Sequence, residues 1–226
     1  MLRVDFHSHV MPAIDDGSRS AVETIAMARG LADLGVERLY LTPHQFKLGN
    51  RLSVPELQKR VDDVWRILAR ANVSIEVCRG AEHYYGEPLL DAVLGGDELV
   101  TFRWDDDVCL LIELPMDQPA FGVRRVAAAL QRRDVVPVMA HPERCSLLAR
   151  EYERIHGWRE AGWRFQLNLL SVVGRHGRTA QRLAHRILDD GFYDCVGSDI
   201  HRPAQLEWVR EAHDAFRSIT TGVAQP

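Results

Sequence analysis

The sequence predicts an α/β fold, a distorted (β/α)7 barrel that resembles a TIM barrel with one unit missing. Three observations carry this prediction. Short runs of β-branched and apolar residues alternate with longer stretches of helical period. The runs are almost continuously apolar, as in parallel strands buried on both faces. Six of the seven runs are followed at the same end by a histidine or a carboxylate. Barrel closure brings these ends around one mouth, whereas an open doubly wound sheet leaves its edge strands too far away.

The predicted strands and helices alternate along the chain. A helix is expected over residues 21–35, where a glycine closes it. A second helix is expected over residues 54–72, with Ser53 suited to the N-cap and Pro55 to the first turn. No internal repeat or low-complexity linker divides the chain, so residues 1–226 are expected to form a single domain. The strands are expected at residues 2–6, 37–42, 75–80, 108–113, 135–140, 164–168 and 193–197.

Composition excludes several classes of protein. The chain has 226 residues, of which 46% are hydrophobic and 27% charged, and this is typical of a globular protein. The formal net charge is −4 and no basic run is longer than a pair, which argues against a nucleic-acid partner. The N-terminal MLRVDFHSH lacks the apolar stretch of a signal peptide, and no segment approaches 18 uninterrupted apolar residues. We therefore expect a cytoplasmic protein without direct membrane insertion.

Side chains that can bind metal ions follow the predicted strands at their carboxyl ends. His7 and His9 follow the first strand, and residues two apart in an extended chain point to the same side, so both can reach one ion or cluster. Just beyond, the DDG segment supplies Asp15 and Asp16, which the residues alone do not distinguish. The later strands are followed by His44, Glu82, Glu113, His141, Asp199 and His201.

The types of ligand indicate the chemistry. Imidazole nitrogen and carboxylate oxygen suit divalent ions such as Mn²⁺, Fe²⁺ or Zn²⁺. About four imidazoles and about four carboxylates exceed what one ion can accept, so two or three ions with bridging carboxylates are expected. Such clusters favour phosphoester hydrolysis, because ions can generate hydroxide at neutral pH and stabilise the charge of an in-line transition state. Arg144, three residues beyond His141, could add a guanidinium fork to the phosphate oxygens.

These residues carry a resemblance to a known family. The segments HSH, DDG, TPH, GAE, IEL, AHPER and SDIH, in this order and spacing, resemble the PHP (polymerase and histidinol phosphatase) superfamily. Within it, the chain is most similar to the bacterial manganese-dependent tyrosine-protein phosphatases of capsule and exopolysaccharide synthesis. The resemblance covers residues 1 to about 203 and implies a PHP-type distorted (β/α)7 barrel with a trinuclear metal site. Relatives usually continue with a final helix, whereas this chain runs into ITTGVAQP.

The resemblance also implies roles for individual residues. Arg144 matches the arginine that follows the fifth-strand histidine, and Arg202 in HRP matches a second arginine that contacts the phosphate. Asp16 is preferred over Asp15, because it is the second aspartate of the matching DDG. The implied metal ligands are His7, His9, Asp16, His44, Glu82, Glu113, His141, Asp199 and His201.

The implied function is that of a metal-dependent protein-tyrosine phosphatase. It would hydrolyse phosphotyrosine by metal-activated hydroxide, with Mn²⁺ as the expected ion and Fe²⁺ or Zn²⁺ as alternatives. The expected substrate is a bacterial tyrosine kinase that regulates capsule or exopolysaccharide synthesis. The alternative is a PHP phosphatase of a small phosphomonoester such as histidinol phosphate. A barrel retained only as a binding module is disfavoured by the complete set of ligands. The sequence does not indicate an oligomeric state.

Other residues are expected to be structural or inert. A cysteine-dependent phosphatase needs an arginine six residues after its thiolate, and none of the four cysteines has one. His156, His176, His185 and His213 lie on helical patterns and are expected to be structural, while His83 is expected to point away from the metal ligands. The loop after His44 is the expected place for substrate contacts. The tryptophans are expected to be mostly packing groups: Trp65, Trp104, Trp158, Trp163 and Trp208.

Overall fold

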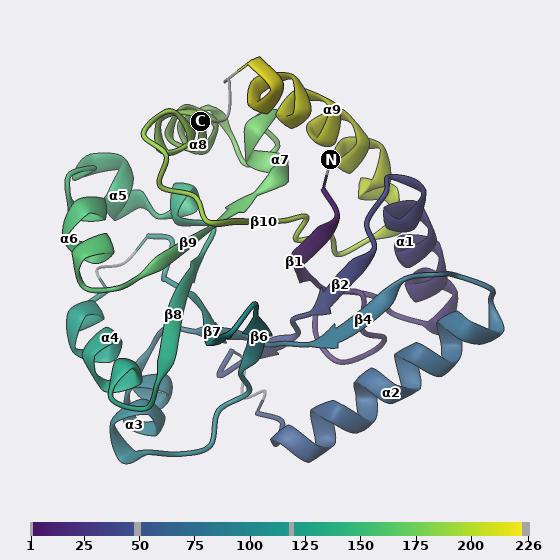
Figure 1. The fold of residues 1–226 in the computed structure, drawn as a ribbon, viewed down its shortest axis with the longest axis horizontal. Helices are drawn as coiled ribbons and strands as arrows, with labels where there is room; N and C mark the ends of the chain where they lie inside the picture. Colours follow the sequence, from purple (N-terminus) through teal and green to yellow (C-terminus); the bar gives the residue numbers. More distant parts are fainter. Residues whose placement is uncertain (1, 48–50, 118–119, 223–226) are drawn as a thin grey trace.

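A curled parallel sheet with helices around its outside forms the framework of the protein (Figure 1). The structure is a computed structural model that describes residues 2–47, 51–117 and 120–222. The strands are β1 (Val4–Ser8), β2 (Arg38–Leu41), β3 (His44–Gln45), β4 (Glu76–Arg79), β5 (Glu82–Tyr84), β6 (Phe102–Trp104), β7 (Asp107–Glu113), β8 (Val135–Ala140), β9 (Arg164–Asn168) and β10 (Cys195–Gly197). The α-helices are α1 (Ala21–Asp33), α2 (Val54–Arg70), α3 (Glu87–Gly95), α4 (Val123–Gln131), α5 (Ser146–Arg150), α6 (Arg154–Glu160), α7 (Leu169–Val172), α8 (Arg178–Asp189) and α9 (Leu206–Gly222), and the 3-10 helices are η1 (Pro142–Arg144) and η2 (Pro203–Gln205).

The strands follow one another around the sheet in the order expected for a barrel. One set runs β1-β2-β4 and the other β10-β9-β8-β7-β5-β3, with parallel pairing throughout both. The two sets meet where β10 returns to β1: the amide of Asp199 donates to His7 O at 2.8 Å, and the amide of His9 donates to Ile200 O at 3.1 Å. The predicted distorted (β/α)7 barrel is confirmed.

The distortion lies in the second and third units. In each of these units the predicted strand ends and a second, short strand follows after two residues. Thr42 and Pro43 separate β2 from β3, and Gly80 and Ala81 separate β4 from β5. Pro43 has no N–H to donate to a ladder, which explains the first break. The short strand β6 was not predicted; it pairs antiparallel with β7. The breaks shift β3 and β5 into the second set of strands, where His44 and Glu82 become paired neighbours.

Most of the predicted boundaries agree with the structure. The strands predicted at 135–140 and 164–168 are β8 and β9 without change. Ser53 caps α2 with a capping box to Glu56, and Pro55 lies in the first turn, as the sequence indicates. A final helix, α9, is present, contrary to the departure noted at the C-terminus, and it lies against α7 and α1 (Figure 1).

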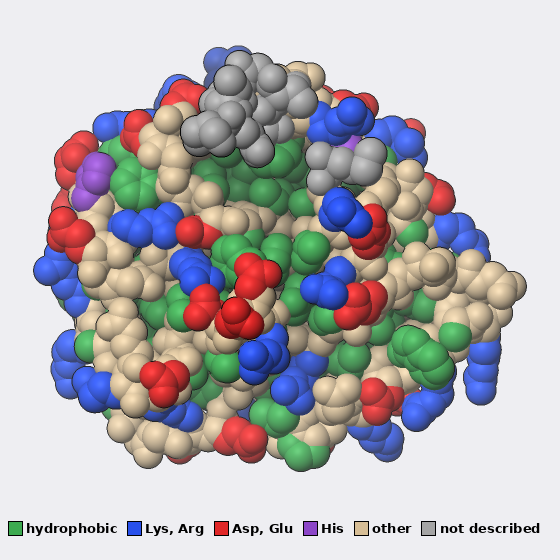
Figure 2. Space-filling model, in the orientation of Figure 1, with side chains coloured by type: hydrophobic (Ala, Val, Ile, Leu, Met, Phe, Trp, Pro, Cys, Tyr) green, Lys and Arg blue, Asp and Glu red, His purple; other side chains and the backbone are tan. Residues whose placement is uncertain are grey.

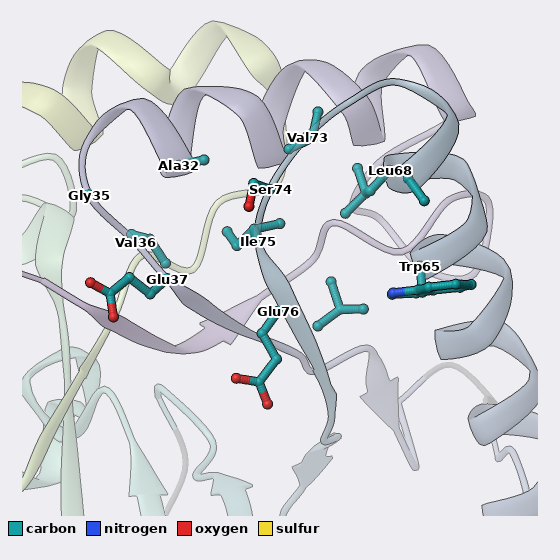
Figure 3. Close-up of a pocket in the computed structure, with 12 residues that line it drawn as sticks. Ala32, Gly35, Val36, Glu37, Trp65, Leu68, Val73, Ser74, Ile75 and Glu76 are labelled. Carbon is teal, nitrogen blue, oxygen red and sulfur yellow. The ribbon is translucent and has the colours of Figure 1, made fainter.

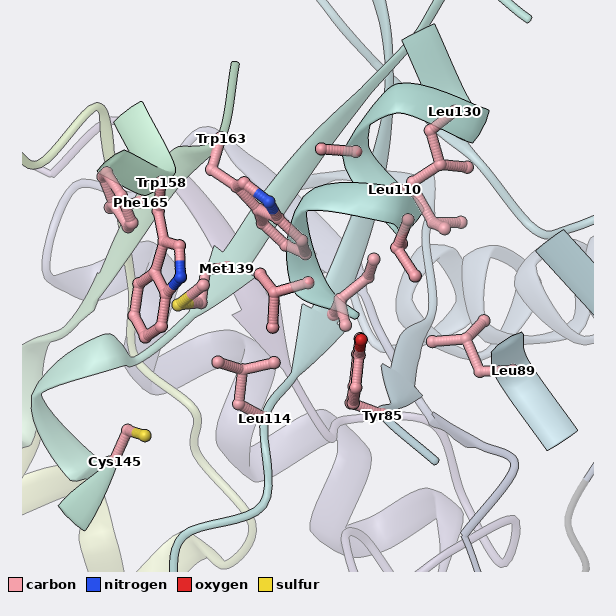
Figure 4. Close-up of a cluster of buried hydrophobic side chains, with 14 of the residues drawn as sticks. Tyr85, Leu89, Leu110, Leu114, Leu130, Met139, Cys145, Trp158, Trp163 and Phe165 are labelled. Atoms are coloured by element: carbon pink, nitrogen blue, oxygen red, sulfur yellow. The ribbon is translucent and has the colours of Figure 1, made fainter. Parts of the chain in front are cut away.

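Aromatic and aliphatic side chains fill the space between the sheet and helices α3 to α6 and α8. Trp158, Trp163, Phe165 and Met139 point into this space from different elements (Figure 4), and Trp163 is completely buried. Their large apolar areas hold the helices against the strands. Trp65, which is 59% exposed, is an exception to the expectation that the tryptophans are mostly packing groups. Trp208 is 38% exposed, and it lies under the guanidinium of Arg175.

Charges of both signs are mixed on the face of the molecule seen in Figure 1. Figure 2 shows lysine and arginine side chains beside aspartates and glutamates, with hydrophobic side chains between them. This mixture agrees with a net charge of −4. Among the described residues, no helix combines the length and apolar character needed to cross a membrane.

Closure of the barrel requires a glycine at position 197. A Cβ added to Gly197 would lie 2.4 Å from His7 Cβ and 2.9 Å from His7 N, closer than real contacts allow. Because β1 and β10 approach so closely only in the absence of a side chain, Gly197 sets the position of His7 relative to β10.

Gly197→Ala is expected to lower the free energy of unfolding by about 1–3 kcal/mol, since the added methyl group forces β1 and β10 apart. The midpoint of urea unfolding measures this loss. Gly95→Ala is the matched control, because its Cβ would come no closer than 3.7 Å to another residue. It should be neutral or slightly stabilising. Equal midpoints for Gly197→Ala and the unsubstituted protein would contradict the close approach at the seam.

Candidate metal centre

Histidine and carboxylate side chains converge at the carboxyl ends of the strands. The nine residues expected to bind metal all belong to groups whose nitrogen and oxygen atoms lie within 4.8 Å of one another. The structure therefore brings together the whole predicted set, although it was drawn from distant parts of the chain. The groups found among the described residues are His9–Asp16–His44–His201, His7–His9–Glu82, His7–His141–Asp199 and His44–Glu82–Glu113.

His7 and His9 are oriented by hydrogen bonds on their outer nitrogens. His7 Nδ1 lies 2.9 Å from Gln166 Oε1, and His9 Nδ1 lies 2.8 Å from Asp15 Oδ2. When each ring is neutral, the oxygen accepts a hydrogen bond from Nδ1–H, and the lone pair of Nε2 points inward. The two Nε2 atoms are only 3.2 Å apart. Two inward lone pairs at this separation are suited to binding one cation or neighbouring cations.

Asp15 and Asp16, which the sequence could not separate, have different environments. Asp15 accepts hydrogen bonds from His9, from the amide of Gly17 at 2.9 Å and from the amide of His44 at 3.1 Å. Asp16 Oδ1 instead lies 3.3 Å from His44 Nε2 and 3.4 Å from His201 Nε2. Asp16 can thus act as a ligand, whereas Asp15 orients His9.

Glu82 is the most central carboxylate of the centre. It is 1% exposed, its Oε1 lies 2.9 Å from His141 Nε2, and its Oε2 lies 3.4 Å from His7 Nε2 and 2.8 Å from His44 Nδ1. Neither Oε2 nor His44 Nδ1 has a hydrogen-bond partner of good geometry among the described residues. A buried oxygen and a buried nitrogen without hydrogen bonds are costly in a protein, and a bound cation would satisfy both. The donor set therefore fits divalent ions.

The electrostatics of the centre favour positive charge. Burial opposes protonation of His7, but the carboxylates of Glu82 and Asp199 outweigh it and raise the pKa of His7 to about 9. Burial likewise opposes protonation of His9, and the hydrogen bond to Asp15 and the other carboxylates raise its pKa well above the ordinary value. Burial also opposes ionisation of Asp199, yet the neighbouring histidines hold its pKa well below the usual range. The site thus has a negative potential that stabilises cations.

Arg144 joins the centre through Asp199. Its Nη1 donates to Asp199 Oδ2 at 2.9 Å, and the same oxygen accepts from Asn168 Nδ2 at 2.7 Å. The guanidinium of Arg144 is partly exposed, so it remains accessible from the mouth of the barrel. Arg202 has a different position: its guanidinium donates to the carbonyls of Gly17 and His201. Its contact with phosphate stays a prediction.

Lys47 is a further charged residue of the centre that we did not single out from the sequence. Its Nζ donates to Glu113 Oε2 at 2.9 Å and lies 3.3 Å from His44 Nε2. Burial opposes the charge, but Glu113 more than compensates and raises the pKa of Lys47. The polar residues Gln166 and Asn168 were also missed as supports. Polar residues inside a fully buried strand, as in RFQLN, are the signal that could have indicated them.

Two of the candidate ligands have strained backbones. His141 has φ 32° and Asp199 has φ 51°, in the left-handed region that non-glycine residues rarely adopt. His141 follows directly after β8, and Asp199 is the second residue after β10. At both positions the chain turns out of the sheet. Strain of this kind costs about 1–3 kcal/mol and is common at functional sites.

The remaining histidines lie outside the centre. His83 is buried and its Nδ1 lies 3.1 Å from Leu111 O, so it points away from the candidate ligands, as expected. Of the four histidines on helical patterns, His176 differs because it lines a cavity beside Arg144.

A larger hollow of about 700 Å³ lies between α1, α2 and the starts of β2 and β4 (Figure 3). Trp65, Val36 and Val73 line it, and none of the nine candidate ligands does.

The barrel and its centre define the class of protein: a PHP-type barrel with side chains suited to several divalent ions. The chain belongs to the family of capsular polysaccharide synthesis proteins CpsB/CapC, whose sequence model matches residues 3–211.

Individual relatives are similar along most of the chain. Tyrosine-protein phosphatase YwqE of Bacillus subtilis is 27% identical over 199 residues, which cover 88% of this chain and 77% of the relative. Tyrosine-protein phosphatase CpsB of Streptococcus pneumoniae is 26% identical, covering 93% of this chain and 88% of the relative. A crystal structure from work on YwqE and CpsB, described as metal-dependent tyrosine phosphatases, superimposes with a TM-score of 0.84 at 25% identity, covering 95% of this chain and 86% of that one.

Protein stripped of metal by a chelator is expected to lose stability as pH rises. The pKa of His7 is about 9 in the folded protein against 6.5 as its ordinary value, so the folded state binds the proton more tightly. This contribution is complete below about pH 6.5 and is lost as pH rises through about 9, a change on the order of 1–3 kcal/mol. Urea midpoints between pH 6.5 and 9.5 measure it. His7→Gln should reduce the dependence, and the remainder should come from His9, whose pKa is also raised. His156→Gln, at an exposed position, should keep it in full, and a flat profile in the unsubstituted protein would refute the assignment.

Proposed function

We propose that the protein is a metal-dependent protein-tyrosine phosphatase. The single observation that carries this proposal is the convergence of nine imidazole and carboxylate groups, with Arg144 beside them, at the mouth of the barrel. The relatives named tyrosine-protein phosphatases support the choice of substrate. The physiological substrate that we propose is a bacterial tyrosine kinase regulating capsule or exopolysaccharide synthesis, in keeping with the family.

We infer that the nine residues hold two or three ions, with Mn²⁺ as the native one. His7, His9, His44, His141 and His201 would supply nitrogen, and the four carboxylates would supply oxygen. Ions bound there would lower the pKa of water toward neutrality and withdraw charge from the phosphate. Asp15 and Gln166 keep the imidazoles of His9 and His7 in the orientation and tautomer that binding needs.

The positive side chains at the mouth are suited to the phosphate group. Arg144 can present a guanidinium fork to two phosphate oxygens while it stays bound to Asp199. Lys47, which is 30% exposed and lies beside Glu113, can donate to a third oxygen. Both charges would stabilise the transition state in which negative charge builds up on phosphorus oxygens.

Of the two candidate ligands that could also protonate the leaving tyrosinate, His201 is the better suited, in the state in which its Nε2 is released from an ion. Asp199, the other candidate, is a poor proton donor because its pKa lies well below the usual range. The ring of His201 is 23% exposed, and its Nδ1 lies 2.8 Å from the backbone oxygen of Asp199. A ring held in this way at the rim can exchange protons with solvent.

The four cysteine thiols are unsuited to a covalent mechanism. Burial raises the pKa of Cys109 and of Cys78 to about 11, and it raises that of Cys145 as well. Cys195 is fully buried and its pKa lies well above the usual range. A thiol with a raised pKa is a weak nucleophile at neutral pH. All four cysteines are free, which also supports our proposal of a cytoplasmic location.

The test compares two substrates on protein that has been chelated and then reconstituted with Mn²⁺. Phosphate release from a phosphotyrosine peptide is expected to exceed release from histidinol phosphate, and chelation should abolish both. Separate reconstitution with Fe²⁺, Zn²⁺ or Mn²⁺ ranks the three ions by the rate of phosphate release that each supports. Preference for histidinol phosphate would assign the protein to small-molecule metabolism, and inactivity on both substrates would exclude a phosphatase function.

His141→Ala is expected to lower turnover of the phosphotyrosine peptide more than about 100-fold, because loss of a ligand affects the centre at least as strongly as loss of its supports. The variant should remain folded by circular dichroism, since the ring lies at the mouth and not in the apolar core. His156→Ala is the control, because that ring is half exposed and distant from the centre in the fold. Near-normal turnover in His141→Ala would exclude the proposed mechanism.

A further inference from the structure

A cavity of about 470 Å³ lies beside the candidate centre, and the proposed phosphatase reaction does not use it. Arg144 forms part of its wall, and the same guanidinium donates to Asp199 at 2.9 Å. The cavity is therefore only one side chain away from the position that we assign to the phosphate group. Whatever it binds would lie next to the reacting phosphotyrosine.

The cavity wall carries positive charge. Arg150, at the end of α5, lines it together with Arg144, and the side chain of Arg150 is exposed. Among the described residues, no carboxylate lies within ion-pair distance of Arg150, although nearby exposed arginines such as Arg154 have such partners. The hydroxyl groups of Ser146 and Thr179 also line the cavity and can donate hydrogen bonds.

The carboxylate of Glu143 does not form an ion pair with either arginine among the described residues. Glu143 lines the cavity but is 1% exposed, and both of its oxygens are already bonded. Oε1 accepts from the amide of Asn168 at 3.0 Å and from Ser171 Oγ at 2.8 Å, while Oε2 accepts from the hydroxyl of Tyr193 at 2.8 Å. Its hydrogen bonds hold it in the wall, and because Arg144 is bound to Asp199 and assigned to the reacting phosphate, Arg150 is the guanidinium offered to a ligand.

The rest of the wall suits a side chain with an apolar stem. Met116, Ala149 and Ala180 contribute apolar surface. His176 lies 3.0 Å from Ser171 Oγ, and because burial and the charge of Arg144 lower its pKa to about 4, the ring is neutral at physiological pH. The cavity thus combines apolar surface with the guanidinium of Arg150, unpaired among the described residues, and this is the chemistry that recognises an acidic side chain carried on a peptide.

We propose that this cavity is a subsite for an anionic side chain of the substrate close to the scissile phosphotyrosine, either a carboxylate or a second phosphorylated tyrosine. Arg150 is the residue that determines this specificity, while Arg144 remains committed to the reacting phosphate. The inference rests on the proposed function.

The test is a series of phosphotyrosine peptides that differ only in the residues flanking the phosphotyrosine. These residues are alanine, lysine, glutamate or a non-hydrolysable phosphonate analogue of phosphotyrosine, and para-nitrophenyl phosphate serves as a substrate with no flanking residue. With Mn²⁺-loaded enzyme, kcat/KM should be about tenfold higher for peptides with an anionic neighbour than for the alanine peptide. Whether glutamate or the phosphonate gives the larger gain identifies the source of the charge.

Arg150→Gln should remove this preference and leave kcat/KM for the alanine peptide and for para-nitrophenyl phosphate within about twofold of the original values. Arg150→Glu should shift the preference to the lysine peptide. Arg154→Gln is the matched control: this exposed arginine pairs with Glu151 and should retain the preference when substituted. Unchanged melting temperatures verify that each variant is folded.

Two results would overturn the inference while leaving the phosphatase proposal intact: equal kcat/KM for all peptides in the unsubstituted enzyme, or an equal loss on every substrate, para-nitrophenyl phosphate included, in Arg150→Gln. Inactivity of the unsubstituted, Mn²⁺-loaded enzyme on every peptide and on the aryl phosphate would instead overturn the proposed function, and the subsite with it.

Discussion

The seam between β1 and β10 is the constraint on which the arrangement of the centre depends. Hydrogen bonds from Asp199 to His7 and from His9 to Ile200 join the first strand to the last across almost the full length of the sequence. The buried carboxylate of Asp5 reinforces the seam, because it accepts from the amides of both His7 and Ser198. Without this joint, ligands from opposite ends of the chain would lie at separate edges of an open sheet and could not share an ion.

The centre trades stability for chemistry. Burying imidazoles and carboxylates costs free energy of solvation, and their mutual attraction and hydrogen bonds offset this cost. The left-handed backbones of His141 and Asp199 add strain at the points where strands end. The apolar layer around Trp163 and Phe165 is continuous between the sheet and the surrounding helices. Its burial stabilises the fold enough to offset the strain and the desolvation of the centre.

Much of the fold could be predicted because its signals are local. The strands β8 and β9 are buried apolar runs bounded by turns, and Ser53 with Pro55 marks the start of α2. The set of candidate ligands could also be predicted, because each lies near or beyond the carboxyl end of a predicted strand. Lys47 could not, since it lies just beyond β3 without a strand or helix pattern, next to Phe46, which has a positive φ of 60°. The residues alone did not separate Asp15 from Asp16, although the resemblance favoured Asp16, because the amides of Gly17 and His44 that hold Asp15 are placed only by the folded chain.

The cysteines are free, and each of their thiols has a pKa raised by burial, even that of Cys145, which adjoins Arg144. Hydrogen peroxide attacks thiolates, so enzymes that rely on a low-pKa cysteine lose activity when a cell is exposed to oxidants. Here the groups assigned to metal and phosphate binding are imidazoles, carboxylates, a guanidinium and an ammonium, and none of them is a thiol. Signalling through such a protein would therefore depend, under oxidative stress, on the ions it holds and not on the survival of a sulfur nucleophile.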